Sequence, residues 1–152
     1  MFEKFARSAR TAVVDARSEA ALRGDRRVGA EHLLLALLRE PPLAQAFGAD
    51  ADQARAAADA LDRAALAAVG IDLGAAPLGA PATLGKHVPF TSAAKGVLRD
   101  ALKIASSERA RSITAGHLGR ALLERPDPDP AAALISALSI DRAAASQRLI
   151  DR

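Results

Sequence analysis

The sequence contains no cysteine, tryptophan or tyrosine, and its only aromatic residues are four phenylalanines, 3% of the chain. The absence of cysteine excludes disulfides, thiol catalysis and thiolate metal sites, and it is consistent with a reducing cytoplasm. Strands favour aromatic and β-branched runs, which are scarce here. Half of the residues are hydrophobic, and alanine and leucine supply most of them. We therefore expect an all-α protein.

Long hydrophobic runs are also missing. The longest purely apolar run, Leu33 to Leu38, is far short of the roughly 20 residues that span a bilayer. The segment Met1 to Val14 is charged and amphipathic and lacks the pattern of a signal peptide. We expect a cytoplasmic protein with no membrane partner.

A concentrated excess of charge is absent as well. The chain has 21 basic and 18 acidic residues, a net charge of +3, and the arginines are spread among acids along its length. A nucleic-acid footprint is normally a concentrated basic patch. This balance indicates a solvated surface, although the pI near 9.9 leaves a nucleic-acid-binding helical protein as a rival interpretation.

An internal repeat is present. Residues 5–41 laid over residues 90–126, at a constant offset of 85, match at thirteen positions, five of them alanine. The other matches include scarce residue types, as in Phe5/Phe90, His32/His117 and Pro41/Pro126. Farther along the chain the offset becomes 91, which predicts a six-residue surface insertion in the second copy. A duplicated unit predicts two similar helical modules packed together, with two related versions of the groove at their junction.

Apolar periodicity and capping residues predict the helices. On the first helix, the apolar stripe consists of Phe2, Phe5, Ala9, Ala12 or Val13, Ala16 and Ala20. The opposite face carries the charged residues Arg7, Arg10, Asp15, Arg17 and Glu19. The later helices are predicted from Gly29 to Leu38, from Leu43 to Phe47, from Asp50 or Asp52 through Ala68, from Thr91 to about Arg109, from Thr114 to Pro126 and from Asp141 to Asp151. The predicted inner face of the fourth helix is Ala54, Ala58, Leu61 and Ala65.

Residues 70–86 hold four glycines and two prolines without helical periodicity, which is typical of a linker. The predicted organisation is a first helical repeat over residues 1–69, a linker over residues 70–87 and a second helical repeat over residues 88–152.

Three stretches resemble one family. They are Met1-Phe2-Glu3-Lys4-Phe5, Gly29-Ala30-Glu31-His32-Leu33-Leu34-Leu35-Ala36-Leu37, and Val88-Pro89-Phe90-Thr91 followed by Ala94-Lys95-Gly96-Val97-Leu98. In order and spacing they are similar to the amino-terminal (Clp N) repeat domain of Clp AAA+ unfoldases, especially the ClpC type. The resemblance implies two four-helix repeats packed with pseudo-twofold symmetry. It also implies a domain that docks substrate and adaptor proteins of a Clp unfoldase-protease.

The sequence departs from the family pattern in two respects. A Clp unfoldase continues into two ATPase modules, whereas this sequence stops at Arg152, so it resembles a free-standing N domain and we expect no unfolding activity. The second repeat has Gly116 where the family has glutamate.

Glu31 is a candidate ligand-binding residue. The resemblance implies a role in recognising phosphoarginine, because the matching glutamate takes part in that recognition in ClpC domains. A carboxylate can bind a guanidinium by paired charge-assisted hydrogen bonds. With Gly116 in the second copy, at most one such site is expected. The alternative is that Glu31 only completes the start of its helix, where an ionised carboxylate is favoured.

Phe2, Val13, Phe90 and Lys95 are the other candidate ligand-binding residues. The resemblance places them on the face where the repeats meet and where cyclic-peptide antibiotics bind ClpC-type domains. Arg99 departs from the acidic residue usual there. An exposed apolar patch is open to a partner, whereas core packing is the alternative for Phe90 and the expectation for Phe5.

His32 and His117 lack the spaced ligands that a metal needs, so they are predicted to pack or to cap their helices. No catalytic constellation stands out. We expect no enzyme activity and no cofactor. The expected function is protein or peptide binding that modulates Clp proteolysis, and the alternatives are sequestration of cyclic-peptide antibiotics or nucleic-acid binding.

Overall fold

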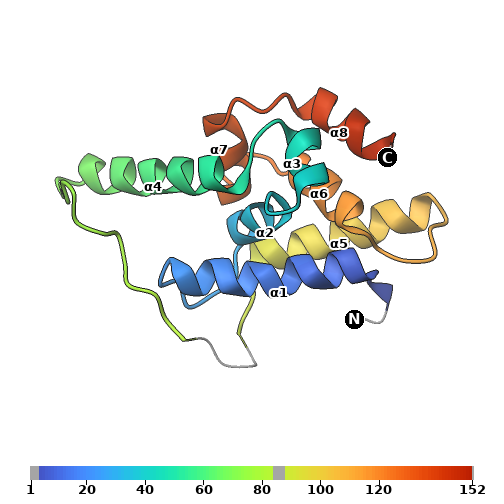
Figure 1. Ribbon diagram of the computed structural model, residues 1–152, viewed down its shortest axis with the longest axis horizontal. Helices are drawn as coiled ribbons and strands as arrows, with labels where there is room; N and C mark the ends of the chain where they lie inside the picture. Colours follow the sequence, from blue (N-terminus) through green and yellow to red (C-terminus); the bar gives the residue numbers. More distant parts are fainter. Residues whose placement is uncertain (1–3, 84–87, 152) are drawn as a thin grey trace.

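A computed structural model describes residues 4–83 and 88–151, and within these ranges the chain forms eight α-helices and no strand longer than an isolated bridge (Figure 1). The helices are α1 (Arg7–Leu22), α2 (Ala30–Leu37), α3 (Pro41–Phe47), α4 (Ala51–Ala68), α5 (Ser92–Ser107), α6 (Ala115–Leu123), α7 (Pro130–Ala137) and α8 (Arg142–Ile150). The all-α prediction is confirmed.

Four helices begin at the capping residues that the sequence indicates. Asp50 accepts a hydrogen bond from the backbone of its own helix at 2.8 Å, and Asp141 does so at 3.1 Å. Thr91 and Thr114 accept equivalent bonds at 3.1 and 3.4 Å. Each side-chain oxygen satisfies an N–H that has no partner within its helix, which explains why the helices start there.

The third helix starts two residues earlier than predicted. Pro41 and Pro42 do not precede α3 but form its first turn. Proline is tolerated there because the N–H that it lacks would have no helical acceptor. Helix α7 begins in the same way at Pro130.

Reciprocal backbone pairing relates the two repeats. Phe5 forms a parallel bridge with Ile113, and Val28 forms one with Phe90. At the repeat offset of 85, Phe5 corresponds to Phe90 and Val28 to Ile113, so each repeat pairs its leading segment with the other repeat in the same way. Backbone hydrogen bonds of 2.8 to 3.0 Å close both bridges. This exchange is the pseudo-twofold relation expected of two packed four-helix repeats.

Equivalent positions of the two repeats also share an unusual backbone conformation. Gly24 and its equivalent Arg109 have φ of 75° and 55°. Gly48 and Ser139, which are related by the offset of 91, have φ of 78° and 54°. The repeats thus keep the left-handed turn at both positions even where the second copy lacks the glycine that adopts it without strain.

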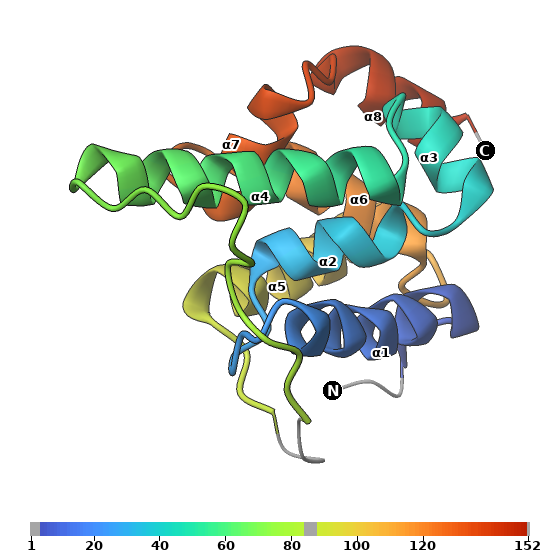
Figure 2. The same cartoon turned by 60° about the vertical axis from the view of Figure 1, so that its left-hand side comes forward.

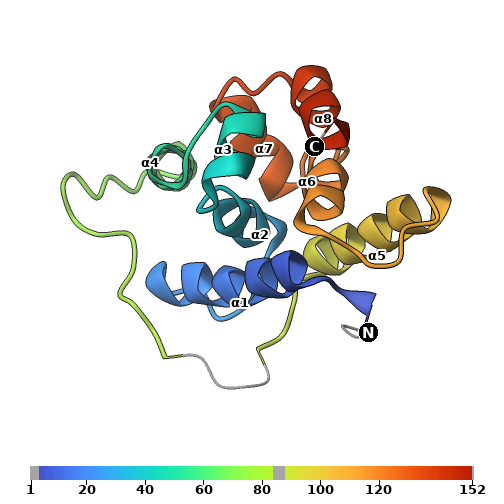
Figure 3. The same cartoon turned by 45° about the vertical axis from the view of Figure 1, so that its right-hand side comes forward.

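The central helices α2 and α6 contact each other. Each outer helix also contacts the central helix of the other repeat, α1 with α6 and α5 with α2. Figures 1, 2 and 3 show α1 and α5 in one layer on the same side of α2 and α6. Phe5 is 5% exposed, which confirms its predicted core position. The core is continuous across both repeats.

Helix α4 projects beyond this core (Figure 2). Ala54 and Ala58 are buried as predicted, but Ala65 is exposed because no helix of the described residues covers the distal end of α4. The segment 70–83 that follows contains no helix or strand. Arg63 holds it by donating to the carbonyls of Gly74 and Ala76. No helix of the described part of the chain is long and apolar enough to cross a membrane.

Candidate functional site

The start of α2 is organised by His32. Its Nδ1 accepts a 2.8 Å hydrogen bond from the backbone N–H of Gly29, so the ring proton lies on Nε2, which donates to Asp25 at 2.8 Å. His117 makes the equivalent bonds at the start of α6, with the N–H of Thr114 at 2.9 Å and with Glu108 at 3.2 Å. Both histidines are buried helix caps, as predicted.

Glu31 lies one residue before His32 and folds back over Gly29. Its side chain is 26% exposed, with Oε1 3.4 Å from Nδ1 of His32. A Cβ atom added to Gly29 would lie 1.7 Å from the same oxygen, so the glycine provides the space that the carboxylate occupies. Burial raises the pKa of Glu31, His32 opposes the rise, and the negative charge of Asp25 adds to it.

Glu31 lines a surface pocket of about 540 Å³ that both repeats share; we call it the Glu31 pocket. Leu61 of α4 and Leu134 of α7 supply apolar wall. Arg26 and Arg27 line the same pocket, are exposed, and form no hydrogen bond or ion pair with the part of the chain that the structure describes. The pocket therefore combines the poorly solvated Glu31 carboxylate with the two available guanidinium groups, and Asp25 and Asp62 also line it.

The other repeat carries a related pocket, also of about 540 Å³, around the start of α6; we call it the Gly116 pocket. Gly116 corresponds to Glu31 at the offset of 85, and its lining residues Leu43 and Leu149 correspond to Leu134 and Ala58 at the offset of 91. The sequence-based expectation of two related grooves is therefore met. Only the Glu31 pocket has a carboxylate at this helix position, whereas Glu40 lines the Gly116 pocket from another segment.

Glycine is not required by packing at position 116. An added Cβ atom would approach Thr114 Oγ1 at 3.5 Å, an ordinary van der Waals contact. At the start of this helix, Ser8 accepts a 3.0 Å hydrogen bond from the N–H of Ala115. The space that a glutamate would need beyond Cβ opens into the Gly116 pocket.

Among the described residues, the other predicted site residues Val13, Phe90 and Lys95 line neither pocket. Val13 is 8% exposed and packs in the core, Phe90 is half-buried, and Lys95 is exposed on α5. Phe2 lies outside the described residues. The structure therefore separates Glu31 from Lys95 and buries most of Val13.

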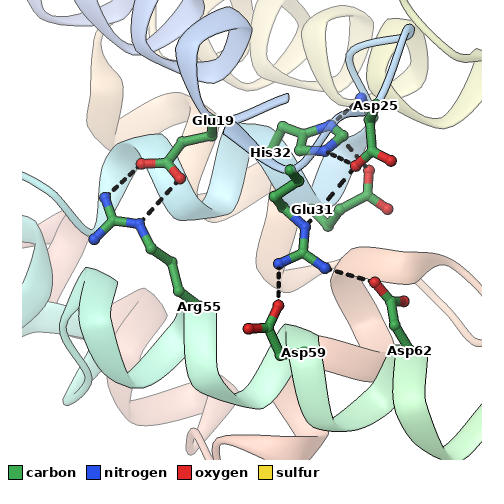
Figure 4. Close-up of polar contacts among 9 residues, drawn as sticks. Glu19, Asp25, Glu31, His32, Arg55, Asp59 and Asp62 are labelled. Atoms are coloured by element: carbon green, nitrogen blue, oxygen red, sulfur yellow. Dashed lines mark hydrogen bonds and ion pairs between the residues drawn. The ribbon is translucent and has the colours of Figure 1, made fainter. Parts of the chain in front are cut away.

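Sequence analysis missed an ion-pair cluster between α1 and α4 (Figure 4). Glu19, predicted on the exposed face of α1, is instead fully buried, and Arg55 of α4 donates to its two oxygens at 2.5 and 3.1 Å. Arg23 donates to Asp59 at 2.7 Å and to Asp62 at 2.5 Å. The available signal was that Glu19 is three residues from Ala16 and adjacent to Ala20, both on the apolar stripe.

The described residues contain no group of three or more histidine and acidic side chains arranged to hold a metal ion. The Glu31 pocket can bind by charge and hydrogen bonding.

In a comparison with known families, the model of the Clp repeat (R) N-terminal domain matches residues 4–76. The chain carries a Clp N-terminal repeat domain. Among solved structures, the N-terminal domain of the chaperone ClpD from Arabidopsis thaliana is similar over 100% of this chain and 99% of that chain, with a TM-score of 0.74 and 22% identity. This likeness extends the Clp N fold over both repeats.

A chain solved in preliminary structural investigations of a malarial protein secretion system is similar over 97% of this chain and 93% of that chain, with a TM-score of 0.66 and 18% identity. Comparison with curated proteins gives no match. A Clp N domain is by itself a non-catalytic module with a protein-binding role in Clp chaperone and protease systems.

Proposed function

We propose that this Clp N domain docks arginine-phosphorylated proteins through the Glu31 pocket. The observation that supports it is the pairing, in one pocket, of the poorly solvated Glu31 carboxylate with Arg26 and Arg27, which have no partner among the described residues. Phosphoarginine is the matching ligand because its guanidinium is a hydrogen-bond donor and its phosphoryl group is an anion.

The Glu31 carboxylate alone, or the two arginines alone, would select a ligand less strictly. A carboxylate accepts paired hydrogen bonds from any arginine, and arginine side chains bind any phosphate or carboxylate in bidentate fashion. Together they favour a ligand that carries both kinds of group a short distance apart. Burial strengthens the contact with Glu31, since charge-assisted hydrogen bonds are stronger where water is excluded.

The raised pKa of Glu31 supports a binding role. Burial and the nearby charge of Asp25 make the free carboxylate unfavourable, and a bound guanidinium would offset both effects. A side chain that only completed the start of a helix would gain nothing from being covered in this way.

Binding of this kind would bring substrate or adaptor proteins of a Clp unfoldase-protease to the domain. If the domain acts apart from an ATPase ring, its occupancy competes with the unfoldase for the same proteins. It then modulates Clp proteolysis without catalysing any step.

Fluorescence polarisation with a phosphoarginine peptide and its unmodified twin tests this proposal. We expect the wild type to prefer the phosphorylated peptide, and Glu31→Gln to weaken that binding by about tenfold, the usual effect of losing a charged hydrogen bond. The control is Glu40→Gln, which removes a carboxylate from the Gly116 pocket instead. Equal affinity for the twin peptides, or an equal loss in the control, would refute the proposal.

Sequestration of cyclic-peptide antibiotics is a second candidate, and the exposure of Lys95 and the partial exposure of Phe90 favour it. The same polarisation assay with a labelled cyclic-peptide antibiotic tests it. Lys95→Ala should weaken binding, and Glu31→Gln should not. An antibiotic that fails to bind the wild type removes this candidate.

A further inference from the structure

The Glu31 pocket borders a second pocket of about 580 Å³, which lies between α1, α4 and the segment that follows α4; we call it the α1–α4 pocket. Arg23, Asp25 and Asp62 line both pockets. Arg23 donates to Asp59 and Asp62, and Figure 4 shows these two carboxylates pointing from α4 toward α1. This group of ion pairs forms the boundary between the pockets, so a ligand held at Glu31 has the α1–α4 pocket directly beside it.

The third wall of the α1–α4 pocket is the chain that returns from the end of α4 to the end of α1 (Figure 2). We call residues 74–82 the crossing segment. Near its start, Arg63 of α4 donates to two of its backbone carbonyls. At its end, the N–H of Ala82 donates to the carbonyl of Ala21 at 2.8 Å. The crossing segment is therefore tied to both helices.

Two glycines let the crossing segment lie directly against the turn after α1. A Cβ atom added to Gly24 would lie 2.4 Å from the carbonyl oxygen of Ala80. One added to Gly79 would lie 2.9 Å from the carbonyl oxygen of Arg23. Backbone therefore packs on backbone here, and the position of this wall is fixed by contacts that a larger residue would disrupt.

The charged side chains that line the α1–α4 pocket have partners within the chain. The pairs are Glu19 with Arg55, Arg23 with Asp59 and Asp62, Asp25 with His32, and Arg63 with the carbonyls of the crossing segment. A charged ligand group would have to displace one of these partners. In this respect the pocket differs from the Glu31 pocket, where Arg26 and Arg27 have no partner among the described residues.

The surface that the α1–α4 pocket leaves open to a ligand is apolar. Each of its three walls contributes one leucine. Leu22, the last residue of α1, is 57% exposed, whereas Leu66 of α4 and Leu78 of the crossing segment are half-buried. Covering such surface with another apolar group is favourable because it removes both from water. An aliphatic side chain is therefore the group that this pocket fits.

We propose that the α1–α4 pocket binds an aliphatic side chain close in sequence to the phosphoarginine of the same bound protein, an inference that rests on the proposed docking of phosphoarginine at Glu31. The bound chain would pass over Arg23, from the charged pocket into the apolar one. Its phosphoarginine would fix the register at Glu31, and Leu22, Leu66 and Leu78 would select the neighbouring residue. The substrate class is then arginine-phosphorylated segments with leucine, isoleucine or valine on one side of the modified residue.

Fluorescence polarisation on the full chain with a series of labelled peptides tests this proposal. Each peptide has one phosphoarginine in a background of alanine and serine, and a single leucine is moved through the four positions before it and the four after it. We expect leucine to tighten binding by about tenfold at one or two neighbouring positions on one side only, the gain from burying most of one leucine side chain. An equal gain at every position, or a gain at none, would overturn the proposal.

Two matched variants test whether the leucine binds in the α1–α4 pocket. Leu22→Gln changes an exposed leucine that lines this pocket, whereas Leu102→Gln changes a leucine of α5 that is 41% exposed and lines neither pocket. We expect the leucine gain to fall below about threefold in Leu22→Gln and to stay at about tenfold in Leu102→Gln. A gain that Leu22→Gln leaves intact would place the leucine elsewhere, for example at the apolar wall of the Glu31 pocket, and would overturn the proposal.

The leucine-free phosphoarginine peptide and an unmodified leucine peptide distinguish this result from a failure of the Glu31 pocket. Leu22 does not line that pocket, so Leu22→Gln should bind the leucine-free phosphoarginine peptide as the wild type does. Preference for phosphoarginine without a leucine gain overturns the aliphatic site alone. A leucine gain that depends on Leu22, without any preference for phosphoarginine, supports the aliphatic site and removes the proposed ligand of Glu31.

Discussion

Glu31 opposes stability at the site where we propose that it binds phosphoarginine. Its carboxylate is poorly solvated and lies close to Asp25, and its pKa is raised, with burial as the largest cause. The folded protein therefore binds the Glu31 proton more tightly than the unfolded chain does. It follows that the free energy of unfolding falls as pH rises from the ordinary glutamate pKa, about 4.3, through the raised value in the fold.

Replacing Glu31 by glutamine should therefore stabilise the protein at neutral pH while it weakens ligand binding. Below the ordinary glutamate pKa the gain should vanish, because the carboxyl group is then protonated in both folded and unfolded chains. Urea unfolding of wild type and Glu31→Gln across this pH range measures the difference.

Glu108 provides a control, because its pKa is shifted in the opposite direction from that of Glu31. Its hydrogen bond with Arg120 is the main cause of its lowered pKa, and the bond to His117 acts in the same direction. Stability from this carboxylate is present above the ordinary glutamate pKa and is lost as pH falls through the lowered value. Glu108→Gln should therefore destabilise at neutral pH. If Glu31→Gln destabilised in the same way, Glu31 would be a structural residue.

At the scale of elements, the pairing of Glu19 with Arg55 fastens α4 to α1. The Glu19 side chain is 1% exposed, and its next cation, Arg39, lies 3.8 Å away. Arg55→Met should lower the free energy of unfolding by about 3 kcal/mol, because it leaves a buried carboxylate with a single distant partner. Denaturant unfolding monitored by circular dichroism measures this loss.

Arg63→Met is the matched control on the same helix. Arg63 donates only to carbonyls of the exposed segment 70–83, so its replacement should cost no more than about 0.5 kcal/mol. Equal losses in the two variants would contradict an anchoring role for the Glu19–Arg55 pair.

Local signals account for most of the elements that the sequence predicts. Asp50, Thr91, Thr114 and Asp141 cap helices because each carries a side-chain oxygen that reaches its own backbone, an interaction within four residues. The burial of Glu19 could not be predicted in this way, since its partner lies 36 residues away on another helix. Tertiary pairing decided that position, whereas propensity and periodicity treat a glutamate as a surface residue.

The candidate site was predictable in part from the sequence. The repeat and the family resemblance indicate Glu31 and the loss of its counterpart at Gly116. The basic side chains that accompany Glu31 were not predicted, because Arg26 and Arg27 lie in a turn without periodicity, and their position in the pocket depends on the packing of α4 and α7. The helix pattern indicates Ala12 or Val13 on the buried stripe, and both are buried, whereas the resemblance placed Val13 on the ligand face.

At the scale of the whole molecule, the two repeats carry related pockets that differ at the equivalent positions Glu31 and Gly116. The reciprocal bridges and the shared left-handed turns show that the two repeats keep the same backbone plan. Position 116 has room for a side chain, so the missing carboxylate is a difference in chemistry and not a consequence of the fold. The two pockets have equal volume, and we expect the one with a carboxylate at this helix position to be the one that binds phosphoarginine.

Isothermal titration calorimetry with a phosphoarginine peptide tests this claim most directly, because it reports stoichiometry as well as affinity. The account predicts one bound peptide per wild-type chain, about tenfold weaker binding of that peptide to Glu31→Gln, and a second site in Gly116→Glu. Two equivalent sites in the wild type, or an affinity that Glu31→Gln leaves unchanged, would contradict it.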